Sequence, residues 1–218
     1  AYEIASCLVG SEMCIRDRWI NPQSSKKMPV VNPATEEIIG EVILGNEEDV
    51  NIAVNAAKQS FKSFSKTSKE ERMSILKNIR KISEARFDDL ADAMTMEMGA
   101  PRKMSREAQA DAAIGHLDGF ISALEKHEEK IELSNTDVLL KEPIGVCGLI
   151  TPWNWPINQI TLKVLPVIAT GCTSILKPSE HTPLSAMVYA EILDEAGVPA
   201  GVFNLVQGDG EGLSLIHI

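Results

Sequence analysis

The sequence has few of the features that mark secreted, membrane-embedded or nucleic-acid-binding proteins. Its 218 residues include only four cysteines, Cys7, Cys14, Cys147 and Cys172, and no paired motif among them. This scarcity favours a reduced, cytoplasmic setting over a disulfide scaffold. No apolar run approaches the roughly 20 residues that cross a membrane. The formal net charge of -10 opposes non-specific binding to nucleic acid, because phosphates would be repelled.

What remains is the composition of a folded protein. Apolar residues make up 44% and charged residues 24%, with 14 glycines and 11 prolines. These values exclude disordered, collagen-like and mini-protein chains. The length suits one good-sized domain or two small ones.

The first half of the sequence predicts a strand pair followed by helices. Residues 30–42 alternate as two short strands around an Asn-Pro turn. Asn46 caps one helix, and a capping box at Ser68 opens a second. Further helices are expected over residues 86–98 and 103–127, followed by an extended segment over residues 131–140.

From residue 145 onward, short apolar strands alternate with helices. Strands are expected at residues 145–150, 173–176 and 203–206, and helices at 157–170 and 182–197. Closely spaced apolar strands of this kind are typical of a parallel βαβαβ unit buried on both faces. The fold class expected from the residues is therefore α/β.

Each predicted strand ends in a segment that could carry chemistry. These segments are residues 151–156, 177–180 and 207–212. In an open parallel sheet, ligands bind beyond the carboxyl ends of the strands, so the three segments should meet at one crevice.

The second and third segments suit a nucleotide but also have ordinary interpretations. Lys177 and Glu180 are a cation and a carboxylate able to bond sugar hydroxyls, or else a solvated surface pair. Gly208 and Gly210 would let backbone amides approach a phosphate. Their segment is not a G-x-G-x-x-G motif, and an ordinary turn is an equal alternative.

The first segment places Asn154 in a rigid apolar setting. Its neighbours are Pro152, Trp153, Trp155 and Pro156. In low dielectric, a side-chain amide stabilises a developing oxyanion. The alternative role is a cap for the following helix. Lys163 is either a surface charge or an organiser of the same site.

Together these motifs resemble the NAD(P)-dependent aldehyde dehydrogenases. The matching segments are Asn-Pro-Ala-Thr-Glu-Glu (32–37), Asn-Glu-Glu-Asp-Val (46–50), Pro-Trp-Asn-Trp-Pro (152–156), Lys-Pro-Ser-Glu (177–180) and Gly-Asp-Gly (208–210). The resemblance covers residues 19–212. It implies an α/β fold with a parallel Rossmann-like sheet and flanking helices, forming an incomplete cofactor domain.

The resemblance also implies roles for individual residues. Asn154 is implied as the oxyanion-hole amide and Lys163 as a charge-relay lysine. The implied cofactor-binding residues are Ile150, Thr151, Pro152, Trp153, Asn154, Lys177, Ser179, Glu180, Gly208 and Gly210. A carboxylate at Glu180 would repel a 2′-phosphate, so NAD is expected rather than NADP. Residues 130–143 resemble part of the arm through which family members form homodimers or homotetramers.

The family's reaction oxidises an aldehyde to a carboxylic acid with hydride transfer to NAD. A cysteine thiolate forms a thiohemiacetal, and a glutamate base later activates water. Both residues lie downstream in the family, so the chain is expected to be an inactive amino-terminal fragment. Cys147 and Cys172 are interpreted as packing residues. His116, His127 and His181 lack metal or triad spacing and are expected at the surface, and no metal site is expected.

Two other functions stay open. One is a fragment of an acylating, CoA-dependent semialdehyde dehydrogenase, which needs no water-activating carboxylate. The other is a complete non-catalytic nucleotide-binding module.

Both ends of the sequence suggest a non-natural origin. Residues 1–18 lack helical and strand periodicity, and Ser6, Gly10 and Glu12 interrupt what would be a signal peptide's apolar stretch. Residues 13–18 can be encoded by ATG TGT ATA AGA GAC AG, the start of a string that resembles the transposase end used in sequencing libraries. Its reverse complement, CTG TCT CTT ATA CAC AT, translates as residues 213–218. The hypothesis is that residues 1–18 and 213–218 are translated adapter.

The underlying nucleotide sequence tests this hypothesis. We expect the two strings above at the two ends, because both would derive from opposite strands of one DNA element. Sequencing the encoding DNA checks it, and the codons of the degenerate residues Leu213, Ser214 and Arg16 are the most informative. Other codons at these positions would overturn it.

Overall fold

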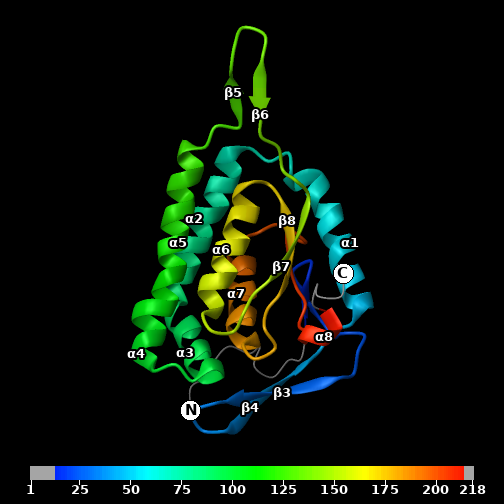
Figure 1. The fold of residues 1–218 in the computed structure, drawn as a ribbon, viewed down its shortest axis with the longest axis vertical. Coiled ribbons are helices and arrows are strands. Elements are labelled where there is room, and N and C mark those ends of the chain that lie inside the picture. The colour runs from blue at the N-terminus through cyan, green and yellow to red at the C-terminus, as the bar shows by residue number, and fades with distance from the viewer. Residues whose placement is uncertain (1–12, 214–218) are drawn as a thin grey trace.

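A computed structural model describes residues 13–213 of the chain (Figure 1). The strands are β1 (Met13–Ile15), β2 (Arg18–Ile20), β3 (Lys27–Asn32), β4 (Glu37–Ile43), β5 (Lys130–Glu132), β6 (Val138–Leu140), β7 (Val146–Ile150), β8 (Thr173–Lys177) and β9 (Phe203–Leu205). The helices are α1 (Glu47–Phe64), α2 (Lys69–Ala85), α3 (Phe87–Met98), α4 (Arg102–Met104), the π-helix η2 (Ser105–Ala110), α5 (Asp111–Lys126), α6 (Pro156–Ala169), α7 (Pro183–Glu195) and α8 (Gly210–Leu213).

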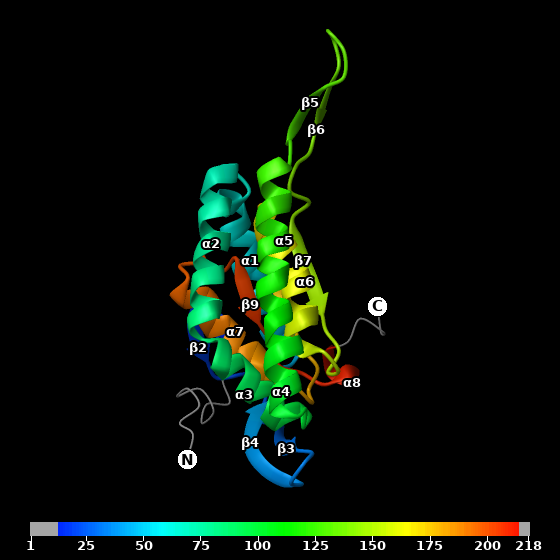
Figure 2. The same cartoon turned by 90° about the vertical axis from the view of Figure 1, so that its left-hand side faces the viewer.

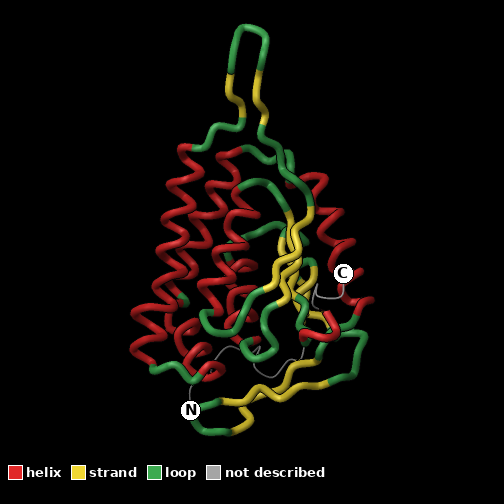
Figure 3. The backbone as a smooth tube through the Cα atoms, in the orientation of Figure 1, coloured by secondary structure: helices red, strands yellow, loops and turns green. Residues whose placement is uncertain are grey.

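A five-stranded sheet with the order β2-β1-β9-β8-β7 forms the centre. Strands β7, β8 and β9 pair in parallel, and α6 and α7 connect them, so the predicted βαβαβ unit is confirmed. Helix α1 contacts β7, β8 and β9. On the other side, α6 contacts β7 and β8, α7 contacts β9, and α2, α3 and α5 pack outside α6 and α7. The backbone tube shows the strands between helices (Figure 3). Every residue of β8 is buried, as expected for the middle strand of a covered parallel sheet.

Strand β1 lies within the first eighteen residues, where the sequence shows no strand periodicity. Met13–Ile15 pairs antiparallel with both β2 and β9, and all three of its residues are buried. A three-residue strand that is covered on both faces has no apolar–polar alternation, so no periodicity marks it in the sequence. The rest of the two segments predicted to be adapter, residues 1–12 and 214–218, lies outside the described residues.

The predicted helix starts are confirmed by their caps. Asn46 and Asp49 form a capping box at α1, and Ser68 and Glu71 form one at α2. Helix α3 ends at Gly99, whose φ of 69° suits glycine. A Cβ atom there would also lie 2.8 Å from the side chain of Pro33, so the turn brings α3 close to the β3–β4 hairpin.

The single helix predicted over residues 103–127 is divided. It consists of α4, the π-helix η2 and α5. Within η2, Ser105 and Gln109 are buried: Thr95 donates to the Ser105 hydroxyl (2.9 Å), and Gln109 donates to the sulfur of Met98 (3.3 Å). A π-turn inserts one residue into the helical repeat. It therefore turns these two polar side chains inward, toward α3.

The extended segment predicted over residues 131–140 is a hairpin. Strands β5 and β6 pair antiparallel and project beyond the ends of the helices (Figures 1 and 2). None of the helices in residues 13–213 has the length and apolar character needed to span a bilayer.

Arg72 joins three chain segments where helices end. It is 2% exposed and donates hydrogen bonds to the carbonyl of Ala169 (2.9 Å), to the carbonyl of Thr67, and to the Glu129 carboxylate. Helix C-termini present unpaired carbonyls that carry partial negative charge. One guanidinium thus bonds the carbonyl at the end of α6 and a carbonyl of the turn between α1 and α2, and holds the base of the β5–β6 hairpin.

We expect Arg72→Met to lower the free energy of unfolding by about 2–4 kcal/mol, because buried carbonyls lose their donor. Methionine keeps the apolar stem, so lost packing is small. Urea unfolding of the purified chain measures the change. Arg80→Met is the matched control: Arg80 pairs with Asp118 and Glu84 at the surface, and its replacement should have little effect. Equal losses in both variants would contradict the role of Arg72.

Candidate functional site

The three strand-end segments meet, as expected. Ile150 is in register with Lys177, and Leu176 with Leu205. Beyond the strands, the Thr151 amide donates to the Lys177 carbonyl (3.2 Å) and the Val206 amide donates to the Leu176 carbonyl (2.9 Å). The parallel register therefore continues into the segments and holds them side by side.

Lys177 is buried and its ammonium group is hydrogen-bonded within the protein, so its interpretation as a solvated surface residue is wrong. Its Nζ donates to the carbonyls of Pro178 (2.9 Å) and Gly208 (2.7 Å), and lies 3.6 Å from the Glu180 carboxylate. Burial lowers the pKa of Lys177, and the Glu180 charge opposes that shift. Two of the three donors of the ammonium thus go to backbone carbonyls, and the 3.6 Å contact with Glu180 is an ion pair rather than a hydrogen bond, which leaves one donor. Lys177 thus joins the end of β8 to the segment after β9, and Glu180, which is partly exposed, faces outward.

The glycines after β9 have different surroundings. Gly208 is buried, and a Cβ atom on it would lie 2.3 Å from the side chain of Leu213. Gly210 is exposed and begins α8. Between them, Asp209 pairs with Lys26 (2.6 Å). Close packing alone thus requires a small residue at Gly208.

Asn154 lies in a different environment from the one predicted. It is exposed, and Trp153 beside it is 54% exposed, so the expected apolar enclosure is wrong within the described chain. The cap interpretation is also wrong: Trp155 occupies the N-cap of α6 without a side-chain bond, and Pro156 starts the helix. No described residue hydrogen-bonds the Asn154 amide. Both of its N–H donors face solvent.

Lys163 lies on α6, the helix that follows Asn154. It is half-buried, two turns inside α6 and about 10 Å beyond the start of that helix. It has no hydrogen bond or ion pair with any described residue.

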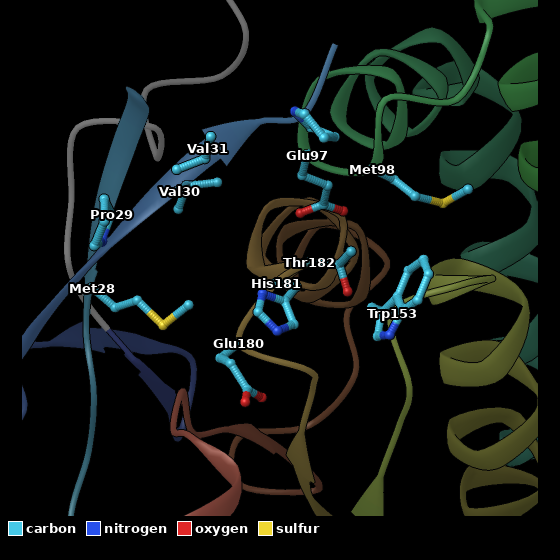
Figure 4. A pocket seen from close by; sticks show the side chains of 11 residues that line it. Met28, Pro29, Val30, Val31, Glu97, Met98, Trp153, Glu180, His181 and Thr182 are labelled. Atoms are coloured by element: carbon cyan, nitrogen blue, oxygen red, sulfur yellow. The ribbon is translucent and has the colours of Figure 1, made fainter. Parts of the chain in front are cut away.

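Two cavities open along this edge of the sheet. One of about 610 Å³ is lined by β3, α3, Trp153 and residues 180–182 (Figure 4). Another of about 360 Å³ lies between α1 and the sheet, with Ile150, Lys177 and Val206 in its wall. The Thr151 hydroxyl, at the end of β7, is buried and has no partner in the described part of the chain.

Comparison with known proteins decides the family. The model of the Aldehyde dehydrogenase family matches residues 19–215. The chain belongs to the aldehyde dehydrogenase family.

Individual relatives agree over nearly the whole chain. A 3-succinoylsemialdehyde-pyridine dehydrogenase from a Pseudomonas species is 48% identical over 203 residues, which are 93% of this chain and 42% of that protein. A crystal structure of an aldehyde dehydrogenase from Bartonella henselae is 44% identical with a TM-score of 0.92, covering 94% of this chain and 44% of its own. A Pseudomonas syringae aldehyde dehydrogenase in complex with NAD+ and octanal is 41% identical with a TM-score of 0.93, covering 97% and 43%. This aldehyde dehydrogenase chain spans less than half the length of these relatives.

Cys147 and Cys172 pack in the interior, as predicted. Cys172 belongs to the buried core, and Cys147 packs against it from the middle of β7. Burial raises the pKa of the Cys147 thiol, with the neighbouring Cys172 as the next cause, which disfavours the reactive thiolate.

The histidines follow the prediction only in part. His181 is exposed and lines the larger cavity. His116 is half-buried, and its Nε2 lies 2.7 Å from the Asn158 side-chain oxygen, so its placement as a free surface residue is wrong. His127 is half-buried as well. Asn158 belongs to no predicted motif, and the spacing of residues in the sequence does not indicate that it pairs with His116 of α5.

The sequence prediction missed Glu97. This carboxylate is 3% exposed and accepts hydrogen bonds from the amides of Leu184 (2.5 Å) and Ser185 (3.1 Å). Burial raises its pKa to about 7, and the hydrogen bonds to these two residues partly oppose the shift. The signal was present: Leu90, Met94 and Glu97 share one face of α3 at helical spacing, which puts a carboxylate on an apolar stripe.

We expect Lys177→Met to loosen the segment after β9, because the Gly208 carbonyl loses its charged donor. Hydrogen bonds to charged groups contribute about 1.5–3 kcal/mol, which corresponds to at least tenfold faster local opening. Hydrogen exchange of peptides that cover residues 206–211 measures it. Lys58→Met is the control, since Lys58 lines the same 360 Å³ cavity from α1. Unchanged exchange in Lys177→Met would show that this bond does not hold the segment.

Proposed function

We propose that this chain supplies the first part of the cofactor domain of an NAD-dependent aldehyde dehydrogenase. The whole enzyme would oxidise an aldehyde to a carboxylic acid, with its nucleophile and general base outside this chain. The observation that carries the proposal is the joining of Thr151, Lys177 and Gly208 at the carboxyl ends of three parallel strands. That is where open parallel sheets bind their ligands.

In this proposal, NAD accepts the hydride, and the chain's residues hold the two reactants. Lys177 and Glu180 bond the adenosine ribose, and the buried Thr151 hydroxyl gains a partner from the bound molecule. Ile150, Pro152, Trp153 and Ser179 border the crevice, and Gly208 and Gly210 lie on its far side. Asn154 donates to the aldehyde oxygen as negative charge develops on it. Lys163 keeps the charge-relay role as a proposal, at a distance from Asn154.

Charge favours NAD over NADP. The Glu180 carboxylate lies 3.6 Å from Lys177 and balances its charge, so the pair offers a 2′-phosphate no net positive charge and the carboxylate itself would repel it. The Pseudomonas syringae relative is in complex with NAD+, which supports the same choice.

Two further proposals concern the setting of the enzyme. The β5–β6 hairpin exposes Leu133 (66%) and Leu140 (60%), with Ile144 (89%) just beyond it. An isolated two-stranded hairpin is marginally stable in water, and a contiguous apolar patch marks an interaction site. We therefore propose that residues 130–143 are an arm that pairs copies of the full-length protein into a homodimer or homotetramer. The three described cysteines, Cys14, Cys147 and Cys172, are free, which supports a reducing, cytoplasmic location.

Binding of dinucleotides to the purified chain tests the cofactor assignment. We expect NAD to bind at least tenfold more tightly than NADP, with Glu180→Gln narrowing that ratio because the repelling charge is removed. Isothermal titration calorimetry at fixed salt measures both, and Glu48→Gln, an exposed carboxylate in the first turn of α1, is the control.

The same preparation tests the proposal that this chain binds the cofactor but lacks the nucleophile and the general base. We expect no NADH from any aldehyde, since neither the thiolate nor the base is present. Equal affinity for NAD and NADP would refute the cofactor assignment, and aldehyde turnover by this chain would refute the assigned roles.

A further inference from the structure

Glu97 is a buried carboxylate without a cationic partner. Its side chain projects from α3 toward the start of α7 (Figure 4), and no lysine, arginine or histidine of the described chain pairs with it. Buried carboxylates almost always have such a partner. Here the partners are two backbone amides in the first turn of α7, where the helix presents unpaired donors and partial positive charge.

Glu97 replaces the ordinary cap of α7. Thr182 holds the N-cap position but makes no side-chain cap bond, and its buried hydroxyl has no partner among the described residues. Threonine usually caps its own helix from this position. Because Glu97 comes from α3, 87 residues earlier, the cap ties the start of α7 to another helix.

The segment that ends at this cap carries the proposed ribose ligands. It leaves β8 at Lys177 and enters α7 at Pro183, and a short turn closes it, with the Thr182 amide donating to the Ser179 carbonyl (3.1 Å). Its first end is held by the sheet register, and its second end by the first turn of α7. Movement of that turn would shift Glu180 relative to Lys177.

We propose that Glu97 is a positioning residue for the dinucleotide: by capping α7 from α3, it fixes residues 177–182 so that Lys177 and Glu180 face the ribose. This inference rests on the proposed function, since it assumes that those two residues bind NAD. Glu97 itself does not touch the cofactor in this proposal.

Ionisation of Glu97 gives the proposal a specific signature. Burial raises the pKa of Glu97 to about 7, so the carboxylate protonates as the pH falls through neutrality. The ionised form accepts from both amides and suits the helix dipole, so the cap weakens on protonation. The other titratable groups that line the same cavity are Glu180 and His181. The neighbouring elements contribute apolar side chains to it, Val30 and Val31 from β3 and Met98 from α3.

Global stability has the opposite pH dependence. The pKa of Glu97 is higher in the folded chain than in the unfolded chain, so its contribution to stability is fully present below about pH 4.5 and is lost as the pH rises through about 7. A residue with only a structural role would change the unfolding midpoint with pH and leave NAD affinity unaffected. A positioning residue makes NAD affinity fall as the pH falls, while the fold itself becomes more stable.

The experiment compares Glu97→Gln with Glu191→Gln in the full 218-residue chain. Glu191 is a matched control: it lies in α7, burial also raises its pKa to about 7, and it pairs with Arg86 (2.7 Å) away from residues 177–182. NAD affinity is measured by calorimetry from pH 6.0 to 8.5, together with hydrogen-exchange protection factors for the Leu184 and Ser185 amides. A His181→Asn variant tests the imidazole as a source of pH dependence.

We expect the unmodified chain to lose about fivefold or more in NAD affinity between pH 8 and pH 6. Glu97→Gln should bind weakly at every pH, with a flat profile and lower protection at Leu184 and Ser185. Glu191→Gln and His181→Asn should keep the profile of the unmodified chain. The double variant Glu97→Gln/Thr182→Val removes any replacement cap from Thr182 and should show the largest loss of protection.

Two outcomes separate failure of this inference from failure of the proposed function. If Glu97→Gln binds NAD with the affinity and pH profile of the unmodified chain, Glu97 does not position the segment, although NAD binding stands. If the unmodified chain binds no NAD at any pH, the proposed function fails. The positioning inference fails with it, and the protection factors still show whether Glu97 caps α7.

Discussion

The parallel pairing of β7, β8 and β9 is the constraint on which the rest of this structure depends. Parallel strands end at the same edge of a sheet, so residues 27 and 29 positions apart in the chain meet there. The pairs Ile150–Lys177 and Leu176–Leu205 and the backbone hydrogen bonds just beyond them show this. Parallel pairing also requires a crossover for each strand, which α6 and α7 provide. A middle strand buried on both faces then needs α1 as cover on the other side. The parallel pairing of these strands thus accounts for both the layered arrangement and the position of the candidate site.

Buried charge in this fold is balanced mainly by the backbone. Arg72 meets the carbonyls of Thr67 and Ala169, and Lys177 meets those of Pro178 and Gly208. Glu97 accepts hydrogen bonds from two backbone amides at a helix N-terminus. Helix termini and strand ends are where unpaired backbone groups occur, and burying a charge is costly unless such groups compensate it. Arg72 and Glu97 therefore join chain segments that no strand pairing connects, and Lys177 adds a side-chain bond beyond the paired ends of β8 and β9.

The sequence predicts those parts of the fold that are encoded locally. Asn46 and Ser68 indicate helix starts because each forms a capping box with a residue three positions later. The apolar runs around Leu149 and Leu176 indicate buried strands. Pairings between distant residues carry no such local signal: Cys14 with Leu205 at the sheet edge, and Glu97 with Leu184 at the helix start. The convergence of the strand ends was predictable because it follows from topology alone. The burial of Lys177 was not, since it depends on which carbonyls the folded loops bring to its Nζ.

The two halves of the candidate site differ in a way that bears on their chemistry. Lys177 is held by three partners and screened from water, so its geometry is fixed before any ligand arrives. Asn154 is exposed, and its amide exchanges hydrogen bonds with solvent. A donor in water gains little when it turns to an oxyanion, because water already stabilises the same charge; the gain appears only when the surroundings exclude water. In the proposed function, this chain's own fold therefore supplies the residues that recognise the dinucleotide ribose. Stabilisation of the oxyanion by Asn154 requires a further surface to cover Trp153 and the start of α6.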